Sequence, residues 1–391
     1  MTTTNNLGIY IHVPFCIRKC PYCGFYSMPI GRGEEDENGR YTISDIQVYK
    51  DKIIRDIKGF GAIYSLGRKV NSIFFGGGTP TVLKGEDLTE ILSQIYLSFD
   101  VLTDCEITLE ANPGSQMDET KLRELLRAGF NRISIGVQSF NDNVLSTLGR
   151  IHNSAEAEAA FKAARQAGFE NINLDLMFGI PGQTMKQWED TLRKTISLNP
   201  EHISFYSLQL EEGTPYFKLF EEGKITELSD DLDRAMYHGA INMLKSAGYK
   251  HYEISNASKP GFECRHNLKY WTLEEYLGIG PSASSYIDGK RFTFDYSGEG
   301  YSENHQNSNF DNMSEYTFTG LRLTGGIDYG SFKSKFGADF REVFSDRWKE
   351  LEEFFTAGFL KEYVSIEGIP MGLRITEKGL DVSNKIMSVF V

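Results

Sequence analysis

The apolar segment Gly8-Ile-Tyr-Ile-His-Val-Pro14 runs directly into a loop with three cysteines, Cys16-Ile-Arg-Lys-Cys20-Pro-Tyr-Cys23. The apolar run predicts a buried strand that ends just before the first thiol. Thiolates are the usual ligands of iron–sulfur clusters, and thiols at these spacings can hold three irons of a [4Fe–4S] cube. Because no fourth cysteine lies nearby, the fourth iron would stay open for chemistry.

A zinc site is the alternative for the same three cysteines, with His12 or the distant Cys264 as the fourth ligand. Three cysteines and a histidine are a common structural zinc set. Zinc ligands usually come as two separated pairs, however, whereas these thiols stand in one tight loop. The sequence therefore favours the cluster over zinc.

The composition is that of an ordinary soluble protein of 391 residues, large enough for two domains or for one barrel with an appendage. The net charge of −13 argues against nucleic acid as a partner, because phosphate binding needs a basic face. The chain has no apolar run of about 18 residues, and its start lacks a signal-peptide pattern. We therefore expect a cytoplasmic protein with at most peripheral membrane contact, and the five cysteines suit that reducing compartment.

Short apolar runs alternate with helical patterns through the first half of the chain, which predicts parallel βα units. The expected strands are Leu7–Val13, Ser72–Phe75, Glu106–Leu109, Arg132–Ile135, Ile172–Met177 and Ile203–Leu208. The expected helices are Asp45–Phe60, Gly85–Phe99, Glu119–Ala128, Ala155–Gly168 and Lys186–Leu198. Six such units make three-quarters of an eight-fold barrel, that is, a partial (β/α)6 TIM-like barrel of the α/β class. Periodicity alone does not separate this barrel from an open sheet.

We expect a core barrel at residues 1–225, a connecting segment at 226–300 and a C-terminal domain at 301–391. Two polar stretches interrupt this plan. The stretch Gly31–Gly39 is predicted to be a solvated loop, and Asp288–Ser314 is predicted to be a flexible strip or a lid.

The tail of the chain predicts a small, mainly α, winged-helix-like module. Its expected parts are the helices Glu315–Arg322 and Glu342–Ala357, a short hairpin around Leu373–Gly379 and a final helix. Such modules often bind DNA, but the acidic chain favours packing or partner docking instead.

A glycine triplet and several polar residues fall at the ends of the predicted strands. Phe74-Phe-Gly-Gly-Gly-Thr-Pro80 closes the second strand, and three glycines let a backbone bend tightly and aim its amides at a charged ligand. Glu110, Gln138, Arg150 and Asp175 lie at or near the ends of the next strands. Barrel enzymes build their active sites at this rim, so several such residues together predict a ligand pocket.

Taken together, these motifs resemble the radical S-adenosylmethionine (SAM) superfamily and, within it, the oxygen-independent coproporphyrinogen III oxidase family. The resemblance extends from about Leu7 to Gly280, and more loosely over the tail. The motifs that carry it are Tyr10-Ile-His-Val-Pro-Phe-Cys16, Phe75-Gly-Gly-Gly-Thr-Pro80, Gly136-Val-Gln-Ser-Phe140, Asn173-Leu-Asp-Leu-Met-Phe-Gly-Ile-Pro-Gly182 and His266-Asn-Leu-Lys-Tyr-Trp271.

The resemblance implies that Cys16, Cys20 and Cys23 hold a [4Fe–4S] cluster whose open iron binds the amino and carboxylate groups of SAM. An electron donor such as a flavodoxin or a ferredoxin would reduce the cluster, which then splits a carbon–sulfur bond of SAM. The residues implied at the SAM pockets, some of them at a second SAM site, are Tyr10, Tyr22, Gly77, Gly78, Thr79, Glu110, Gln138, Arg150, Asp175 and Gln209.

Two departures from the oxidases match the other branch of the family, the haem chaperones (the HemW branch). The oxidases carry a cysteine two residues past the third ligand, where this chain has Phe25, and a longer segment than the fifteen residues before Cys16. The chaperone branch carries Cys-x3-Cys-x2-Cys-x-Phe and the motif His-Asn-x-x-Tyr-Trp, here His266–Trp271. The resemblance thus implies a protein that binds haem and passes it to a respiratory acceptor protein.

Two other activities stay open. One is oxidation of coproporphyrinogen III to protoporphyrinogen IX by loss of two propionate carboxyls, and the other is a radical methyl or carbon transfer on another tetrapyrrole. In the oxidation, SAM would supply the hard chemical step, and the barrel would position the substrate and exclude water.

Haem contact at His266 follows from the resemblance and not from the residues alone. Neutral imidazole is a common axial ligand of haem iron, and Tyr270 and Trp271 could cover an apolar macrocycle face. Cys264 is the other candidate haem ligand. Taken by itself, however, His266 fits a hydrogen-bonded structural histidine at least as well.

Overall fold

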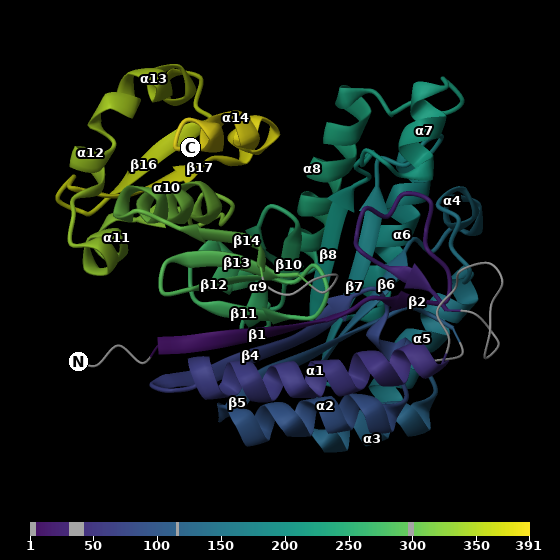
Figure 1. The fold of residues 1–391 in the computed structure, drawn as a ribbon. Coiled ribbons are helices and arrows are strands. Elements are labelled where there is room, and N and C mark those ends of the chain that lie inside the picture. The colour runs from purple at the N-terminus through teal and green to yellow at the C-terminus, as the bar shows by residue number, and fades with distance from the viewer. Residues whose placement is uncertain (1–4, 31–42, 115–116, 296–300) are drawn as a thin grey trace.

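The protein, seen here in a computed structural model, is described at residues 5–30, 43–114, 117–295 and 301–391. The predicted loop Gly31–Gly39 lies outside these residues. The first half forms βα units in chain order (Figure 1). Its strands are β1 (Asn5–Val13), β4 (Arg68–Gly77), β5 (Asp100–Ala111), β6 (Arg132–Gln138), β7 (Asn171–Phe178) and β8 (His202–Ser207). Its helices are α1 (Ile43–Tyr64), α2 (Gly85–Ser98), α3 (Glu119–Ala128), α4 (Asp142–Thr147), α5 (Ser154–Ala167) and α6 (Met185–Leu198).

All six strands pair in parallel, in the order β1-β4-β5-β6-β7-β8, which confirms the predicted partial (β/α)6 barrel. Alternation along each strand separates two faces. On β1, Leu7, Ile9 and Ile11 are fully buried in the core that they share with apolar residues of α1. Tyr10 and His12 point to the opposite face, which in a barrel becomes the interior.

The sheet continues beyond the six units on both sides. Next to β1 lies β11 (Tyr276–Ile279), also parallel, followed by the antiparallel strands β12 (Ser284–Ile287), β13 (Lys290–Phe294) and β14 (Tyr301–Gln306). Beyond β8 come β10 (Asn256–Ser258) and β9 (Lys250–Glu253), both antiparallel to their neighbours. Among the described strands, β14 and β9 are the two ends of one twelve-stranded sheet, so strand pairing does not close the barrel there.

The prediction of a flexible strip at Asp288–Ser314 was wrong for the described part of that stretch. Lys290 pairs with Gln306 and Thr293 with Glu303 in a β-hairpin of the main sheet. Helix α10 (Asn309–Gly320) then begins six residues earlier than expected, where Ser308 caps its amino end. Edge strands can be polar because one side faces water, so this hairpin shows no hydrophobic period in the sequence.

Three further helices complete the central part of the chain. They are α7 (Pro215–Glu221), α8 (Asp230–Ser246) and α9 (Arg265–Trp271). In the described part of the chain, no helix combines the length and the apolarity needed to cross a membrane.

The C-terminal region forms the expected helical module with a small sheet, drawn in green and yellow in Figure 1. Its elements are β15 (Ile327–Asp328), α11 (Tyr329–Phe336), α12 (Phe340–Val343), η2 (Ser345–Arg347), α13 (Trp348–Thr356), β16 (Leu360–Val364), β17 (Pro370–Ile375), η3 (Glu377–Val382) and α14 (Ser383–Ser388). The sheet order is β15-β17-β16, so β16 and β17 form the hairpin of a winged-helix-like module. Aromatic rings fill its core: the Phe332 and Phe340 ring centroids lie 5.1 Å apart, and those of Phe344 and Phe390 lie 5.2 Å apart.

Candidate cofactor site

The three cysteines of the first motif lie on one loop held at both ends. Strands β2 (Phe15–Cys16) and β3 (Met28–Pro29) pair in parallel and bring the two ends of the loop together. Cys16, Cys20 and Cys23 are all free thiols and partly exposed. Within the loop, the amide of Cys23 donates to the carbonyl of Cys20 at 3.1 Å.

Two of the thiols receive hydrogen bonds from the barrel rim. The Thr79 hydroxyl lies 3.5 Å from Cys16 Sγ, and Arg150 Nη1 lies 3.4 Å from Cys20 Sγ. Asn112 joins these donors, because its amide nitrogen is 2.7 Å from the Thr79 hydroxyl and its oxygen 2.5 Å from Arg150 Nη2. Asn112 was missed in the sequence, although its place two residues after Glu110, at the end of a predicted strand, would have identified it.

These donors fit thiolates better than thiols. Without a metal, burial raises the pKa of Cys16 and of Cys23, so both sulfurs hold their protons more firmly than an exposed cysteine does. Metal binding removes those protons, and hydrogen bonds to the resulting thiolate sulfurs tune the potential of an iron–sulfur cluster. Three thiols in one loop with donors on two of them therefore suit a cluster.

The fourth zinc ligands considered for the sequence are engaged elsewhere. His12 contacts the Tyr10 hydroxyl through Nδ1 at 3.2 Å and the Tyr26 carbonyl through Nε2 at 2.8 Å. Cys264 is fully buried, and its thiol lies 3.6 Å from Glu106 Oε1. Over residues 5–30, 43–114, 117–295 and 301–391, no three His, Cys, Asp or Glu side chains gather to hold a single metal ion.

The glycine triplet brings the end of β4 against the cysteine loop. Gly77 has φ +103°, and a Cβ there would lie 2.5 Å from the His12 ring. A Cβ on Gly78 would lie 2.6 Å from the carbonyl oxygen of Phe15. Glycine is therefore required at both positions by close approach, and at Gly77 also by its backbone conformation.

The prediction that the amides of this turn point at a ligand was wrong. The Gly77 amide donates to Glu110 Oε2 at 3.1 Å. The amides of Gly78 and Thr79 donate to two carbonyls that flank Pro14, at 2.8 and 2.7 Å. Contact of Gly77, Gly78 and Thr79 with SAM stays a prediction. Because the amides are used within the protein, the carbonyl oxygens of the turn and the Thr79 side chain would have to make that contact.

A cavity of about 590 Å³ opens beside the cysteine loop, and we call it the cluster-side cavity. Of the residues predicted to bind SAM it brings together Tyr22, Glu110, Asp175 and Gln209, and Cys23 and Phe25 also line it. Thr79 and Arg150 line a separate crevice with Cys20 and Asn112. Tyr10, Gly77, Gly78 and Gln138 do not line the cluster-side cavity.

The cluster-side cavity is acidic. Glu110, Asp175 and Glu211 line it, and none of the described residues that line it is a lysine, an arginine or a histidine. Burial, together with the neighbouring Asp175, raises the pKa of Glu110 to about 8. Burial also raises the pKa of Asp175, against hydrogen bonds from Asn173 at 2.7 Å and from Ser134 at 3.1 Å. Without a ligand the Glu110 carboxyl is therefore mostly protonated at neutral pH, and a bound cation would favour its ionised form.

The other predicted SAM residues lie around this cavity. Gln138 ends β6 with φ 64°, uncommon for a residue other than glycine, and its Oε1 accepts a hydrogen bond from the Tyr206 hydroxyl at 3.2 Å. Burial raises the pKa of the Tyr10 and Tyr22 hydroxyls, which therefore stay protonated. Arg150 also donates to the Gly136 carbonyl at 2.8 Å.

The predicted haem contact His266 is buried in helix α9 with both ring nitrogens engaged. Its Nδ1 lies 2.9 Å from the Ser72 hydroxyl and its Nε2 3.0 Å from the Tyr270 hydroxyl. The ring stacks on Phe74 with centroids 5.3 Å apart, and burial lowers the pKa of His266 to about 3. Trp271 packs under the Arg322 guanidinium at 4.3 Å. In this arrangement the hexapeptide joins β4 to the C-terminal region, and haem contact at His266 stays a prediction that requires α9 to open.

Cys264, the alternative haem ligand, is also buried and engaged within the protein. Burial raises the pKa of this thiol to about 12, and Glu106 holds it by the contact described above. A thiolate at Cys264 would therefore also require this part of the chain to rearrange.

Comparison with known proteins agrees with this layout. Residues 10–195 match the model of the radical SAM superfamily, and residues 308–382 match that of the HemN C-terminal domain. The chain is 35% identical over 356 residues to the "Heme chaperone HemW" of Bacillus subtilis, covering 88% of this chain and 90% of that protein. It is 40% identical over 278 residues to the "Heme chaperone HemW" of Escherichia coli, covering 71% and 69%.

Among solved structures, the chain is similar to the coproporphyrinogen III oxidase HemN of Escherichia coli. The TM-score is 0.82 over 99% of this chain and 90% of that one, at 23% sequence identity, which shows a shared fold. Radical SAM proteins use SAM and a [4Fe–4S] cluster, and the thiols and the acidic cavity fit both. The chain belongs to the radical SAM superfamily and, within the oxygen-independent coproporphyrinogen III oxidase-like proteins, to the HemW family.

Proposed function

We propose that this protein is a haem chaperone, which binds haem, carries a cluster liganded by SAM and delivers the haem to a respiratory acceptor protein. The observation that carries the proposal is the similarity to a protein named as a heme chaperone, over 88% of the chain at 35% identity. Phe25, in place of the additional cysteine of the oxidases, supports the same branch. The cytoplasm, as the place of action, and a flavodoxin or ferredoxin as the electron donor belong to the same proposal.

The cluster and SAM have residues suited to them. Cys16, Cys20 and Cys23 would hold the cluster, and the cluster-side cavity would hold SAM; together the two cofactors supply one-electron chemistry. The protein's own part is electrostatic and steric. Thr79 and Arg150 donate to sulfur, while the carboxyls of the cavity balance the positive sulfonium and ammonium groups of SAM. The further SAM contacts in this proposal are Tyr10, Tyr22, Gly77, Gly78, Glu110, Gln138, Asp175 and Gln209, with a second SAM site among them.

The acidic cavity also argues against the oxidase reaction. Coproporphyrinogen III carries four propionates, and the substrate would have to place them near the radical source. In the cluster-side cavity they would meet Glu110, Asp175 and Glu211 and no cation from the described lining residues. A propionate there would find no cation among the described lining residues and would oppose ionisation of the carboxyls, whereas a cation such as SAM is stabilised when Glu110 ionises, so this cavity favours a cation over a tetra-anion.

We propose the same three-part domain division that the sequence predicts. The core barrel at 1–225 would carry the cluster, the segment at 226–300 would carry the hexapeptide, and the domain at 301–391 would complete the molecule. Helix α8 begins at Asp230 and the HemN C-terminal match at residue 308, both within a few residues of these boundaries.

An anaerobic assay tests the proposal. The cluster is reconstituted, and SAM, a reductant and coproporphyrinogen III are added while porphyrins and SAM cleavage are followed together. We expect no protoporphyrinogen IX, whereas the same protein loaded with haem passes it to an apo-acceptor protein. Protoporphyrinogen IX that forms in step with SAM cleavage would replace the chaperone with an oxidase.

A further inference from the structure

A second cavity, of about 640 Å³, lies between the end of the barrel and the C-terminal segment, and we call it the C-terminal cavity. Strand β8 and helix α8 form one side, and Leu380 to Lys385 of η3 and α14 form the other. It shares Tyr206, Ser207, Gln209 and Ser255 with the cluster-side cavity, so the end of β8 forms the wall between them. No role in SAM or cluster binding has been derived for its other lining residues.

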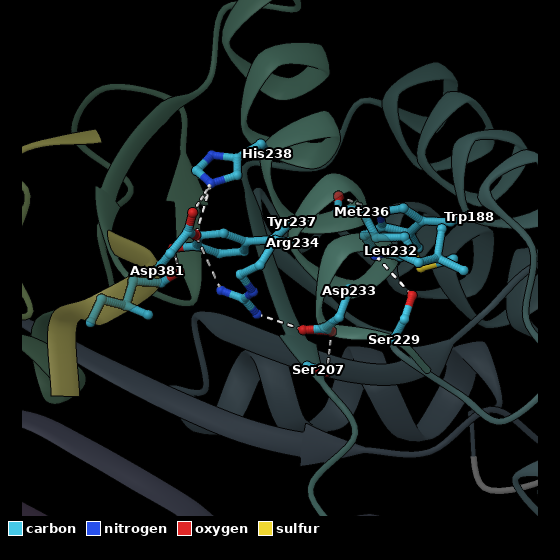
Figure 2. A network of polar contacts seen from close by, with 11 residues as sticks. Trp188, Ser207, Ser229, Leu232, Asp233, Arg234, Met236, Tyr237, His238 and Asp381 are labelled. Carbon is cyan, nitrogen blue, oxygen red and sulfur yellow. Dashed lines mark hydrogen bonds and ion pairs between the residues drawn. The ribbon is translucent and has the colours of Figure 1, made fainter. Parts of the chain in front are cut away.

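Three cations line the C-terminal cavity: Arg234, Arg322 and Lys385, against one carboxylate, Asp381. Arg234 is held by Asp233 at 2.6 Å and more loosely by Asp381 at 3.6 Å (Figure 2). The same Asp381 carboxylate is also bound by His238 at 2.8 Å. A second carboxylate could therefore replace Asp381 at Arg234 without leaving Asp381 unpaired.

The other two cations are less fully paired. Arg322 lies 3.4 Å from the buried Glu253, and its Nε is buried with no hydrogen-bond partner among the described residues. Lys385 is exposed, and its ammonium group contacts no carboxylate in the described part of the chain. The cavity thus offers positive charge that the protein itself does not fully satisfy.

The aromatic rings beneath these cations are mostly packed into the core: Tyr237 is 4% and Phe178 1% exposed, whereas Tyr206 keeps 37% of its surface exposed. The Tyr237 ring stacks on Phe178 with centroids 6.2 Å apart and lies 5.8 Å from Phe205. The Arg234 guanidinium lies over the Tyr237 ring at 5.0 Å, which Figure 2 shows from close by. Leu380 from η3 adds an aliphatic surface. Cations around an aromatic and aliphatic wall suit a ligand with a flat apolar body and carboxylates on its rim.

We propose that the C-terminal cavity is where the haem is docked, with its propionates at Arg234, Arg322 and Lys385 and its macrocycle against the exposed ring of Tyr206 and the aliphatic side chains of Ile254, Leu380 and Val382. This inference rests on the proposed chaperone function, because that function supplies the identity of the ligand. The volume lies in the range of about 300–1,000 Å³ that is usual for pockets of larger organic ligands.

The residues that line the C-terminal cavity determine which part of the haem they can bind. They include no histidine, cysteine or methionine among the described residues, and the hydroxyls of the two tyrosines, Tyr206 and Tyr237, donate to Gln138 and to the Ile254 carbonyl instead of facing the iron. Binding is therefore decided by the carboxylates and the ring and not by the metal. A cargo held in this way can be handed over without breaking a bond to iron.

Three porphyrins and four variants, His266→Ala among them, test the inference. Haem and iron-free protoporphyrin IX should bind the full-length protein with similar affinity, whereas the dimethyl ester of protoporphyrin IX should bind at least about tenfold more weakly because charge-assisted hydrogen bonds are lost. Lys385→Glu and Arg234→Gln should each weaken protoporphyrin IX binding by about fivefold or more. Lys349→Gln removes an exposed lysine of α13 and serves as the matched control, with unchanged affinity.

The outcomes separate the site from the function. If haem binds, but binding is lost in His266→Ala and unchanged in Lys385→Glu and Arg234→Gln, the chaperone stands and the cavity is not its haem site. Equal affinity for the free acid and the dimethyl ester would overturn the inference in the same way. If the wild-type protein binds no porphyrin at all, the proposed function fails and the inference fails with it. Circular dichroism of each variant confirms that a lost signal is not lost folding.

Discussion

The two cavities on either side of β8 share four residues and differ in charge. The cluster-side cavity is lined by three carboxyls and no cation, and the C-terminal cavity by three cations and one carboxylate, as far as the described residues extend. The cysteine loop closes the first, and the last turns of the chain close the second. One wall thus separates a site suited to a cation from a site suited to an anion.

If SAM and haem bind as proposed, this difference in charge would keep each ligand in its own cavity. SAM carries a sulfonium and an ammonium group, and haem carries two propionates. Each ligand would lack a partner of opposite charge in the cavity of the other. The charge of a cavity, more than its shape, would therefore decide which ligand it binds. Gln209 and Ser207 line both cavities, so the end of β8 is the wall that keeps the two sites apart.

The largest expected effect is the loss of the cluster in Cys20→Ala. Because the three thiols would be the whole protein ligand set in the proposed site, the variant should lose nearly all visible cluster absorbance and bound iron after anaerobic reconstitution. Protoporphyrin IX binding should stay as in the wild type, since it belongs to the other cavity. Cys105→Ala, which changes a buried thiol of β5 away from the loop, should keep the cluster. A full cluster in Cys20→Ala would point to different ligands.

The next effect is on stability, in Gly78→Ala. The new Cβ would lie 2.6 Å from the Phe15 carbonyl oxygen, so the cysteine loop would have to shift. We expect a loss of about 2–3 kcal/mol in the free energy of unfolding, measured with urea, together with reduced cluster loading. Gly59→Ala in α1 meets no atom within 4 Å and should instead be neutral or stabilising. Equal stability of the two variants would mean that the turn does not support the loop.

A smaller effect concerns the charge of the cluster-side cavity. The pKa of Glu110 is raised to about 8, so ionisation of this carboxyl should strengthen SAM binding between pH 6.5 and pH 8.5. Glu110→Gln should remove this dependence and weaken binding at pH 8.5 by about tenfold, the equivalent of one pKa unit. Dialysis with labelled SAM at several pH values measures both. Identical pH profiles would show that Glu110 does not face the ligand.

The raised pKa of Glu110 also determines how the stability of the ligand-free protein changes with pH. A carboxyl whose pKa is raised from 4.5 to about 8 on folding binds more protons in the folded state, so stability should fall as the pH rises through that window. Glu110→Gln should flatten this fall, and thermal unfolding of the apo protein at pH 6 and pH 8 would record it.

The smallest effect is expected for Phe25→Cys, which restores the thiol of the oxidases. Phe25 is 71% exposed, so stability should change by less than about 0.5 kcal/mol. Iron content should not rise, and no coproporphyrinogen III should be decarboxylated because the three carboxyls of the cavity remain. Decarboxylation by this variant would show that the residue after the third ligand, and not the charge of the cavity, separates the two branches.

Most of the barrel could be predicted because its signals are local. Short apolar runs between helical patterns predicted the six strands, and the close spacing of the cysteines predicted the loop. The C-terminal part of the sheet could not be predicted in the same way. Strand β11 is short, and the β13–β14 hairpin is polar, so tertiary pairing rather than periodicity decides both.

The position of several candidate residues could be predicted, but their contacts could not. Glu110 and Asp175 were predicted because barrel sites lie at the carboxyl ends of the strands. The amides of the glycine turn, however, are used within the protein. The C-terminal cavity left no signal, because Arg234, Arg322 and Lys385 come from three separate segments that only the folded chain brings together.

Simultaneous binding tests the two-cavity account most directly. The reconstituted protein is dialysed anaerobically against labelled SAM, with and without saturating haem, and both bound ligands are counted. The account predicts that SAM and haem are bound together, and that haem leaves the amount of bound SAM unchanged. Displacement of SAM by haem, mole for mole, would show one shared site and contradict it.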